Sequence, residues 1–233
     1  MSIKGLRVED LQINDLKIMQ SDKLFRFGSD AVALANFIKV KKGERVLDIG
    51  CGAGVIPILL SAKTEASRIV GVELHGETVE LARRNVAFNN LSNLIAIEWL
   101  DARFLPYKRG DFDVITVNPP YTPVSGGLKN ISPAIAMARH EITLTLDDVV
   151  RAAANILRPG GRLYIAHRPR RLVDALVALR AHRLEPKTLQ FVQSSAGRSP
   201  SLFLAEAIMG ANPELKVTVK IHNSANAAGA SPL

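Results

Sequence analysis

The chain has 233 residues, of which 47% are hydrophobic, enough for one α/β domain of ordinary size with a full core. Its single cysteine, Cys51, excludes an internal disulfide and a cysteine-cluster metal site, and its five scattered histidines lack metal-ligand spacing, so we expect no metal. The N-terminal residues lack the apolar stretch of a signal peptide, and no apolar run reaches transmembrane length. We therefore expect a cytoplasmic protein with no membrane partner.

Positive charge is concentrated in the second half of the chain. Residues 1–120 contain 16 Lys and Arg against 15 Asp and Glu, whereas residues 121–233 contain 14 against 7. A basic half can bind a polyanion such as RNA, although a solvated basic surface has the same composition. Five arginines would form a phosphate-binding strip if they shared one face: Arg158, Arg162, Arg168, Arg170 and Arg171.

Strands and helices are predicted to alternate along the chain. Residues 7–27 predict a short hairpin, and a helix follows Gly28, with Ser29 or Asp30 either as its N-cap or in contact with a cofactor. Further strands are predicted at residues 45–49, 68–73, 94–99, 112–117, 162–167, 187–193 and 201–209. Further helices are predicted at residues 55–62, 77–89, 146–157 and 172–181, with a turn at 159–161.

This order of elements favours a doubly wound α/β sheet. We expect a single domain over residues 1–210, in which residues 1–40 pack on the sheet. Residues 211–233 are expected to form a C-terminal extension. Its residues 216–221 alternate like an edge strand, and its small polar end is expected to be disordered.

A glycine-rich turn follows the strand at 45–49. Asp48 lies in that strand, and Gly50, Gly52 and Gly54 follow it, a context in which a nucleotide-type ligand approaches the backbone closely. The third glycine is spaced differently from that of the dinucleotide-binding fingerprint. Glu73 ends the next strand, where a carboxylate can accept hydrogen bonds from both ribose hydroxyls of an adenosine ligand.

Two further polar features follow later strands. Asp101 comes after the strand at 94–99, either as a turn residue or as a ligand contact. The strand at 112–117 ends in Asn118-Pro119-Pro120-Tyr121, which the two prolines hold extended. The Asn118 side-chain oxygen and the Pro119 carbonyl are then adjacent acceptors that suit a planar NH2 group, and Tyr121 offers a surface for stacking. Alternatively, this segment only terminates a strand.

These motifs resemble those of class I S-adenosylmethionine-dependent methyltransferases that modify amino groups. The motifs are Asp48 to Gly54, Glu73, Asp101 and Asn118 to Tyr121. Residues 27–30, 138–141 and 157–162 make the chain similar to the bacterial valine-tRNA adenine-N6 methyltransferases. The resemblance implies a Rossmann-like, mostly parallel sheet of seven strands, with an antiparallel last strand.

The resemblance also implies an activity, transfer of a methyl group from S-adenosylmethionine to the N6 amine of an adenosine in tRNA, beside the anticodon of valine tRNA. Asn118 and Pro119 would accept hydrogen bonds from the amine, and Tyr121 would stack on the base. The residues implied to hold the cofactor are Asp48, Gly50, Gly52 and Glu73 at its amino-acid and ribose parts, Asp101 at its adenine, and Ser29 or Asp30 at its methionine end. The tRNA would bind through the basic C-terminal half. No role follows for residues 139–141.

Three alternatives remain open. Protein glutamine-N5 methyltransferases share Asn-Pro-Pro-Tyr, but usually carry a helical domain before the glycine motif, whereas here fewer than 50 residues precede Gly50. Ribosomal-RNA guanine-N2 methyltransferases share Asn-Pro-Pro but typically continue with an aromatic residue and His, whereas here Thr122 follows Tyr121. An RNA-binding protein with a vestigial cofactor pocket is a non-enzymatic alternative, against which the intact acceptor motif argues.

Overall fold

The computed structural model describes residues 5–22, 24, 26–119 and 144–221, and these contain ten strands and five α-helices. The strands are β1 (Leu6–Asp10), β2 (Lys17–Ser21), β3 (Arg45–Ile49), β4 (Arg68–Glu73), β5 (Ile95–Trp99), β6 (Phe112–Val117), β7 (Leu157–His167), β8 (Leu184–Gln193), β9 (Leu202–Met209) and β10 (Lys216–Ile221). The helices are α1 (Ser29–Phe37), α2 (Val55–Lys63), α3 (Gly76–Phe88), α5 (Leu146–Ile156) and α6 (Leu172–Ala181), with a 3-10 turn at Pro169–Arg171.

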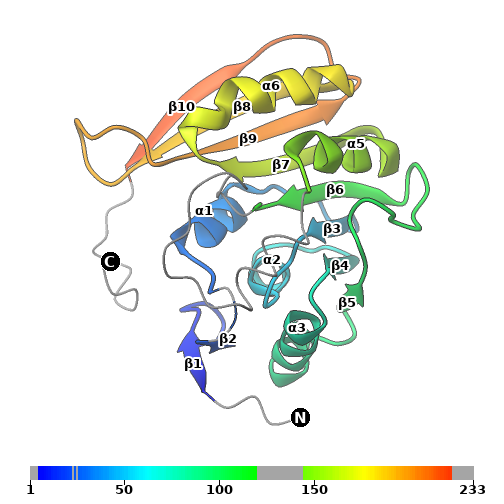
Figure 1. The fold of residues 1–233 in the computed structure, drawn as a ribbon, viewed down its shortest axis with the longest axis vertical. Helices are drawn as coiled ribbons and strands as arrows, with labels where there is room; N and C mark the ends of the chain where they lie inside the picture. Colours follow the sequence, from blue (N-terminus) through cyan, green and yellow to red (C-terminus); the bar gives the residue numbers. More distant parts are fainter. Residues whose placement is uncertain (1–4, 23, 25, 120–143, 222–233) are drawn as a thin grey trace.

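Eight strands of the described residues form one twisted sheet in the order β10-β8-β9-β7-β6-β3-β4-β5 (Figure 1). Strands β3 to β7 run parallel, and β9 is antiparallel to both of its neighbours, β7 and β8. The expected doubly wound, mostly parallel sheet is therefore confirmed. The expected number of seven strands is one too few, because β10 pairs in parallel with β8 at the edge of the sheet.

Helices cover both faces of this sheet and divide its core in two. Successive residues of β3 point to opposite faces, so Val46 packs in the core beneath α1, α2 and α3, whereas Leu47 packs in the core beneath α5 and α6. A strand that is buried on both faces is apolar throughout, which explains the continuous β-branched runs in the sequence. Strands β1 and β2 form the expected hairpin apart from the main sheet (Figure 1).

The parallel strands end at one common edge, and this carboxyl edge collects the residues that the sequence singled out. Ile49 of β3 pairs with Val72 of β4 on one side and with Val117 of β6 on the other. Val117 in turn pairs with Ile165 of β7. The segments that follow β3, β4, β6 and β7 therefore lie next to one another, which is where doubly wound sheets bind ligands.

Strand β7 differs from the prediction in its length. The turn expected at residues 159–161 is part of β7, whose pairing with β6 is irregular between Phe112 and Val114. At Gly161 a Cβ atom would lie 2.9 Å from the Arg158 carbonyl oxygen, so the close backbone approach in this irregular stretch requires glycine. No helix in the described ranges has the length and apolar character needed to cross a bilayer.

Candidate active site

The glycine turn after β3 has the backbone geometry that the motif requires. Gly50, Gly52 and Gly54 have φ values of 72°, 54° and 87°, in the left-handed region that favours glycine. The Gly50 and Cys51 amides donate to the Val72 carbonyl, at 2.9 and 3.0 Å, and fix the turn against β4. A Cβ atom at Gly50 or Gly52 would meet no atom of the described residues within 4 Å, so these residues leave room over the backbone for a ligand.

Glu73 lies at the end of β4 beside this turn. One of its carboxylate oxygens accepts from the Gly52 amide at 3.1 Å, and the other accepts from the Leu74 and His75 amides at 2.8 and 3.0 Å. The side chain is half-buried and a carboxylate has about four acceptor sites, so it can still accept from a ligand hydroxyl. The structure therefore brings Glu73 and Gly52 together, as expected from their positions after neighbouring strands.

Asp48 is fully buried beneath the glycine turn, with 1% of its surface exposed. One carboxylate oxygen accepts from the Thr116 hydroxyl at 2.5 Å, whereas the other, Oδ2, is buried and has no hydrogen-bond partner among the described residues. The pKa of Asp48 is raised to about 7, chiefly by burial; the Thr116 hydrogen bond opposes this rise, and the negative charge of Glu73 adds to it. A cationic or hydrogen-bond-donating ligand group at Oδ2 would satisfy this oxygen.

Thr116 contacts a predicted site residue, and the sequence analysis missed it. It lies in β6 two positions before Asn118, is fully buried, and links the strand that carries the acceptor motif to the strand that carries Asp48. The available signal was a polar residue within an otherwise apolar strand, since buried hydroxyl groups usually have a partner.

Asp101 follows β5 in a turn and binds Arg103. The Arg103 amide donates to one carboxylate oxygen at 2.9 Å, and the guanidinium donates to both. Hydrogen bonds from Arg103 lower the pKa of Asp101, so the carboxylate is ionised at neutral pH. The turn role that the sequence allowed is therefore present, and a contact with a ligand stays a prediction.

The acceptor motif begins where β6 ends, next to the glycine turn. Asn118 and Pro119 are half-buried and follow Val117, the residue that pairs with Ile49 just before Gly50. Pro120, Tyr121 and residues 138–141 lie outside the described residues. The structure thus places the first half of the motif one strand away from the glycine turn.

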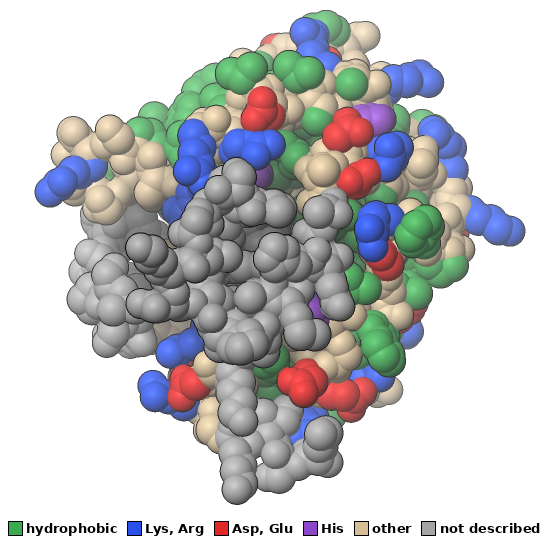
Figure 2. Space-filling view, viewed as in Figure 1, with side chains coloured by type: hydrophobic (Ala, Val, Ile, Leu, Met, Phe, Trp, Pro, Cys, Tyr) green, Lys and Arg blue, Asp and Glu red, His purple; other side chains and the backbone are tan. Residues whose placement is uncertain are grey.

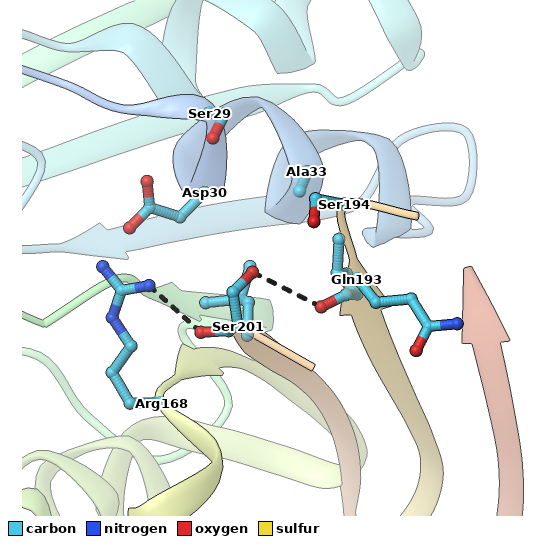
Figure 3. Close-up of a pocket in the computed structure, with 9 residues that line it drawn as sticks. Ser29, Asp30, Ala33, Arg168, Gln193, Ser194 and Ser201 are labelled. Atoms are coloured by element: carbon cyan, nitrogen blue, oxygen red, sulfur yellow. Dashed lines mark hydrogen bonds between the residues drawn. The ribbon is translucent and has the colours of Figure 1, made fainter. Parts of the chain in front are cut away.

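Ser29 and Asp30 start α1, but neither side chain caps the helix. The N-cap is Gly28, with no side-chain hydrogen bond, so the capping alternative is wrong for both residues. Both side chains line a cavity of about 190 Å³ with Arg168 and the turn between β8 and β9 (Figure 3). The described lining of this cavity contains no residue of the glycine turn, and a contact of Ser29 or Asp30 with the methionine end of the cofactor stays a prediction.

No cluster of three or more His, Cys, Asp or Glu side chains within the described ranges could hold a metal ion. The donor set at the carboxyl edge consists instead of a glycine backbone, two carboxylates near it and an amide at the end of β6. Such a set can bind an adenosine-type ligand over the glycine turn and present a second, planar polar group to it.

Comparison with known proteins identifies the family of this chain. The model of the methyltransferase small domain matches residues 11–182. A tRNA1(Val) (adenine(37)-N6)-methyltransferase from Porphyromonas gingivalis is 30% identical over 197 residues, which cover 81% of this chain and 76% of that protein. A putative protein N5-glutamine methyltransferase from Methanocaldococcus jannaschii is 33% identical over 115 residues, which cover 49% of this chain and 56% of that protein.

Among solved structures, a predicted O-methyltransferase from Agrobacterium tumefaciens has the same fold. Its TM-score is 0.67 at 21% identity, and the match covers 82% of this chain and 86% of that one. The glycine turn, the acidic residue at the end of β4 and the family match agree with one another. This chain therefore belongs to the methyltransferase small domain family.

Proposed function

We propose that this methyltransferase transfers a methyl group from S-adenosylmethionine to the N6 amine of an adenosine in tRNA, the one beside the anticodon of valine tRNA. The observation that carries the proposal is the position of Asn118 and Pro119, one strand from the glycine turn. The Porphyromonas gingivalis relative, named for this reaction, supports the choice of substrate. The basic second half of the chain also favours a polyanionic partner.

The residues around the glycine turn fit S-adenosylmethionine. The room that the described residues leave over Gly50 and Gly52 would admit the ligand's amino-acid part, and Oδ2 of Asp48, unpaired among those residues, would suit its ammonium group. Glu73 would accept from the ribose hydroxyls. Asp101, at the end of the next strand, would contact the adenine edge. When bound, the cofactor would supply a methyl group on its sulfonium: the amine nitrogen would bond to this carbon as the carbon–sulfur bond breaks, S-adenosylhomocysteine would leave, and the methylated amine would lose a proton to solvent.

Asn118 and Pro119 would act on the amine. The exocyclic nitrogen of adenine is a poor nucleophile because its lone pair is delocalised into the ring. Acceptors at the Asn118 side-chain oxygen and the Pro119 carbonyl would hold both N–H groups, orient the nitrogen and stabilise the positive charge that develops on it. Tyr121 would stack on the base, which must leave its own stack at a cost of about a few kcal/mol.

Substitution of Asn118 tests this assignment. Asn118→Ala removes one of the two acceptors and should lower kcat by about 10²-fold or more, whereas Asn118→Asp keeps an acceptor and should lose less. The measurement is transfer of label from methyl-labelled S-adenosylmethionine to unmodified valine tRNA, followed by digestion and identification of N6-methyladenosine. Asn93→Ala, at an exposed site, is the matched control. Full activity of Asn118→Ala would overturn the assignment.

A glutamine amide is the second candidate substrate, because it too is a planar nitrogen with two N–H groups. The Methanocaldococcus jannaschii relative supports it over half of this chain. The β1–β2 hairpin, where those enzymes usually have a helical substrate domain, argues against it. The same assay with a release-factor-type protein as second substrate separates the two. Label in methylglutamine would show that the substrate is a protein, and label in N2-methylguanosine would show that it is a guanosine in RNA. Cofactor binding without methyl transfer to any substrate would indicate a non-enzymatic role.

A further inference from the structure

Strand β10 forms the edge of the sheet that lies farthest from the glycine turn. It pairs with β8 over six residues, and no other strand of the described residues pairs with its outer side. Four strands separate β10 from β3, so at about 4.8 Å between neighbouring strands the two lie roughly 24 Å apart. Strand β10 also lies beyond residues 11–182, which match the family model. A partner bound along this edge would therefore not cover the glycine turn.

One face of β10 is apolar and exposed. Val217 pairs with Leu189 of β8, which is buried in a cluster with Ala175 of α6. Residues paired across two strands point to the same face of the sheet, and every second residue of a strand shares a face, so Val217, Val219 and Ile221 lie on this side. Their side chains are 55%, 60% and 44% exposed, respectively. The apolar layer beneath α6 thus continues onto β10, where it is exposed.

Helix α6 extends this apolar surface. It packs on β8, the neighbour of β10 (Figure 1). Val173 and Val177 lie one turn apart on the outer side of α6 and are 72% and 64% exposed. Figure 2 shows hydrophobic side chains gathered where α6 and β10 lie. A single exposed apolar residue is ordinary, but five on neighbouring elements form a surface typical of those that contact another macromolecule.

The opposite face of β10 is basic. Lys216 and Lys220 alternate with the apolar residues and are exposed, and neither forms an ion pair within the described part of the chain. The nearby Glu214 lies 3.7 Å from the ammonium group of Lys187 instead. Strand β10 therefore offers a partner an unpaired backbone edge, an apolar face and two unpaired positive charges.

These features favour one kind of partner. A strand that pairs with β10 places every second side chain opposite the apolar residues and the others opposite the lysines. The first set must be apolar and the second acidic to complement β10. A second copy of this chain is disfavoured, because it would bring its own edge lysines and a formal net charge of +8. RNA could contact the lysines but would leave the valines exposed.

We propose that β10 and the outer side of α6 bind an extended segment of another protein in which apolar residues alternate with Asp or Glu. The segment adds a ninth strand to the eight-stranded sheet. Backbone hydrogen bonds to β10 supply affinity, and the alternating side chains supply specificity. This docking edge lies outside the active site, so the inference goes beyond the proposed function and does not depend on the substrate of methyl transfer.

The probe is a fluorescently labelled peptide in which Val and Glu alternate over about the length of β10. Its binding to the full chain is measured by fluorescence anisotropy. A peptide of the same composition, with its Val and Glu residues in two separate blocks, should bind about tenfold more weakly, because it cannot match both faces of β10. In a strand every second N–H points to the same side. N-methylation of one alternate set of peptide nitrogens should therefore abolish binding, and methylation of the other set should not.

Val219→Asp tests the apolar face. The added charge should weaken binding of the alternating peptide by about tenfold, because it lies among the apolar side chains and repels the glutamates. Val8→Asp is the matched control, since Val8 is a similarly exposed strand residue in the N-terminal hairpin. It should bind the peptide as wild type does.

Reversal of the lysine charges tests the basic face. The double variant Lys216→Glu and Lys220→Glu should bind the Val/Glu peptide about tenfold more weakly and should gain binding of a Val/Lys peptide. The double variant Lys17→Glu and Lys63→Glu, at exposed positions elsewhere, changes the net charge equally and should do neither. A gain of binding requires that β10 is still folded, so it separates a specific contact from loss of structure.

Several outcomes would overturn the proposal. Equal binding of the alternating and blocked peptides, or no effect of either N-methylation, would show that only net charge attracts them. A wild-type dimer that Val219→Asp converts to a monomer would make a second copy the occupant. Weaker tRNA binding by the Lys216→Glu and Lys220→Glu variant, but not by Val219→Asp, would assign this edge to RNA. Methyl transfer should be unchanged in every variant, so these results leave the proposed function to its own test.

Discussion

At the scale of single residues, Asp48 has the most unusual environment in the described chain. Burial beneath the glycine turn, with one oxygen unpaired among the described residues, destabilises the ionised carboxylate. For this reason its pKa is raised to about 7. The same residue is well placed to bind a cationic group, because a positive charge at Oδ2 would restore the ionised form. Affinity for the cofactor and stability without it should therefore change in opposite directions as the pH rises.

Asp48→Asn should flatten the pH dependence of stability. Because the folded pKa lies above the unfolded value of 3.8, the folded state holds the proton more tightly. Wild-type stability is thus fully present at low pH, falls as the pH rises through the unfolded value to about 7, and then levels off, by roughly 4 kcal/mol at most. Asparagine does not ionise. In cofactor-free thermal unfolding at pH 5 and 8, the melting temperature of wild type should fall more than that of Asp48→Asn.

The pH dependence of ligand binding gives a second test of Asp48→Asn. S-adenosylhomocysteine should bind wild-type protein more tightly as the pH rises from 5.5 to 8, because its ammonium group requires the ionised carboxylate. Asp48→Asn should bind it about tenfold more weakly at pH 8, with little dependence on pH in this range. Parallel pH profiles for the two proteins would contradict the role assigned to Asp48.

At the scale of elements, helix α3 connects the N-terminal hairpin to the active site. Asn85 of α3 is fully buried; its side-chain oxygen accepts from the Met19 amide at 2.7 Å, and its NH2 group donates to the carbonyls of Met19 and Ala53 at 3.0 and 2.9 Å. Met19 lies in β2 and Ala53 in the glycine turn. The Asn85 side chain thus pairs with the backbone of β2 as a neighbouring strand would, and it also fixes the turn that would hold the cofactor.

Asn85→Ala should therefore reduce both stability and cofactor affinity. Three backbone groups lose a buried partner, so the free energy of unfolding should fall by about 2–4 kcal/mol. Asn89→Ala is the control at the C-cap of the same helix: Asn89 binds the Lys17 amide and carbonyl in the same way, but it is only half-buried and has no hydrogen bond to the glycine turn among the described residues. Urea unfolding and S-adenosylhomocysteine titration should show a larger loss for Asn85→Ala in both measurements. Equal losses would mean that Asn85 only docks the hairpin.

At the scale of the whole molecule, the two edges of the sheet differ in the way their charges are arranged. At the amino edge, Glu44 and Arg162 are both buried and paired with each other, and Arg158 bridges Glu44 and Asp113. Asp113 also accepts from the Arg45 amide at 2.8 Å, which joins β6 to β3. This edge is therefore held together by internal ion pairs, whereas the carboxyl edge has the glycine turn, the acceptor motif and the arginine-lined cavity.

The eighth strand adds little to this architecture, and its removal tests whether residues 1–210 form a complete domain. Strand β10 pairs with β8 over six residues, but its side chains are largely exposed, including Val217 and Val219. Truncation after Gly210 should lower the melting temperature by less than about 10 °C, since a few hydrogen bonds and little apolar area are lost. Methyl transfer should remain. Light scattering should increase, because the ten-residue edge of β8 is exposed. Loss of cooperative unfolding would show that the domain extends to β10.

The sequence by itself determined the order of the strands and helices and most of their bounds to within one residue, because each depends on local apolar periodicity and on glycine and proline. Strands β7 and β8 begin five and three residues earlier than predicted, at Leu157 and Leu184. It also determined which residues meet at the carboxyl edge, since parallel strands must end there. Gly50, Gly52, Glu73 and Asn118 were accordingly placed at this edge from the sequence, their contacts with cofactor and substrate stay predictions, and the family match agrees with the resemblance drawn from them.

Only the tertiary structure decided what depends on contacts between distant segments. The pKa of Asp48 results from burial under two packed faces and from the Thr116 hydroxyl, 68 positions along the chain. The position of Asp30 across a cavity from Arg168 follows from the packing of α1 against β7 and β9. Periodicity records which face a residue occupies but not which distant side chain it meets there, so these features could not be read from the chain alone.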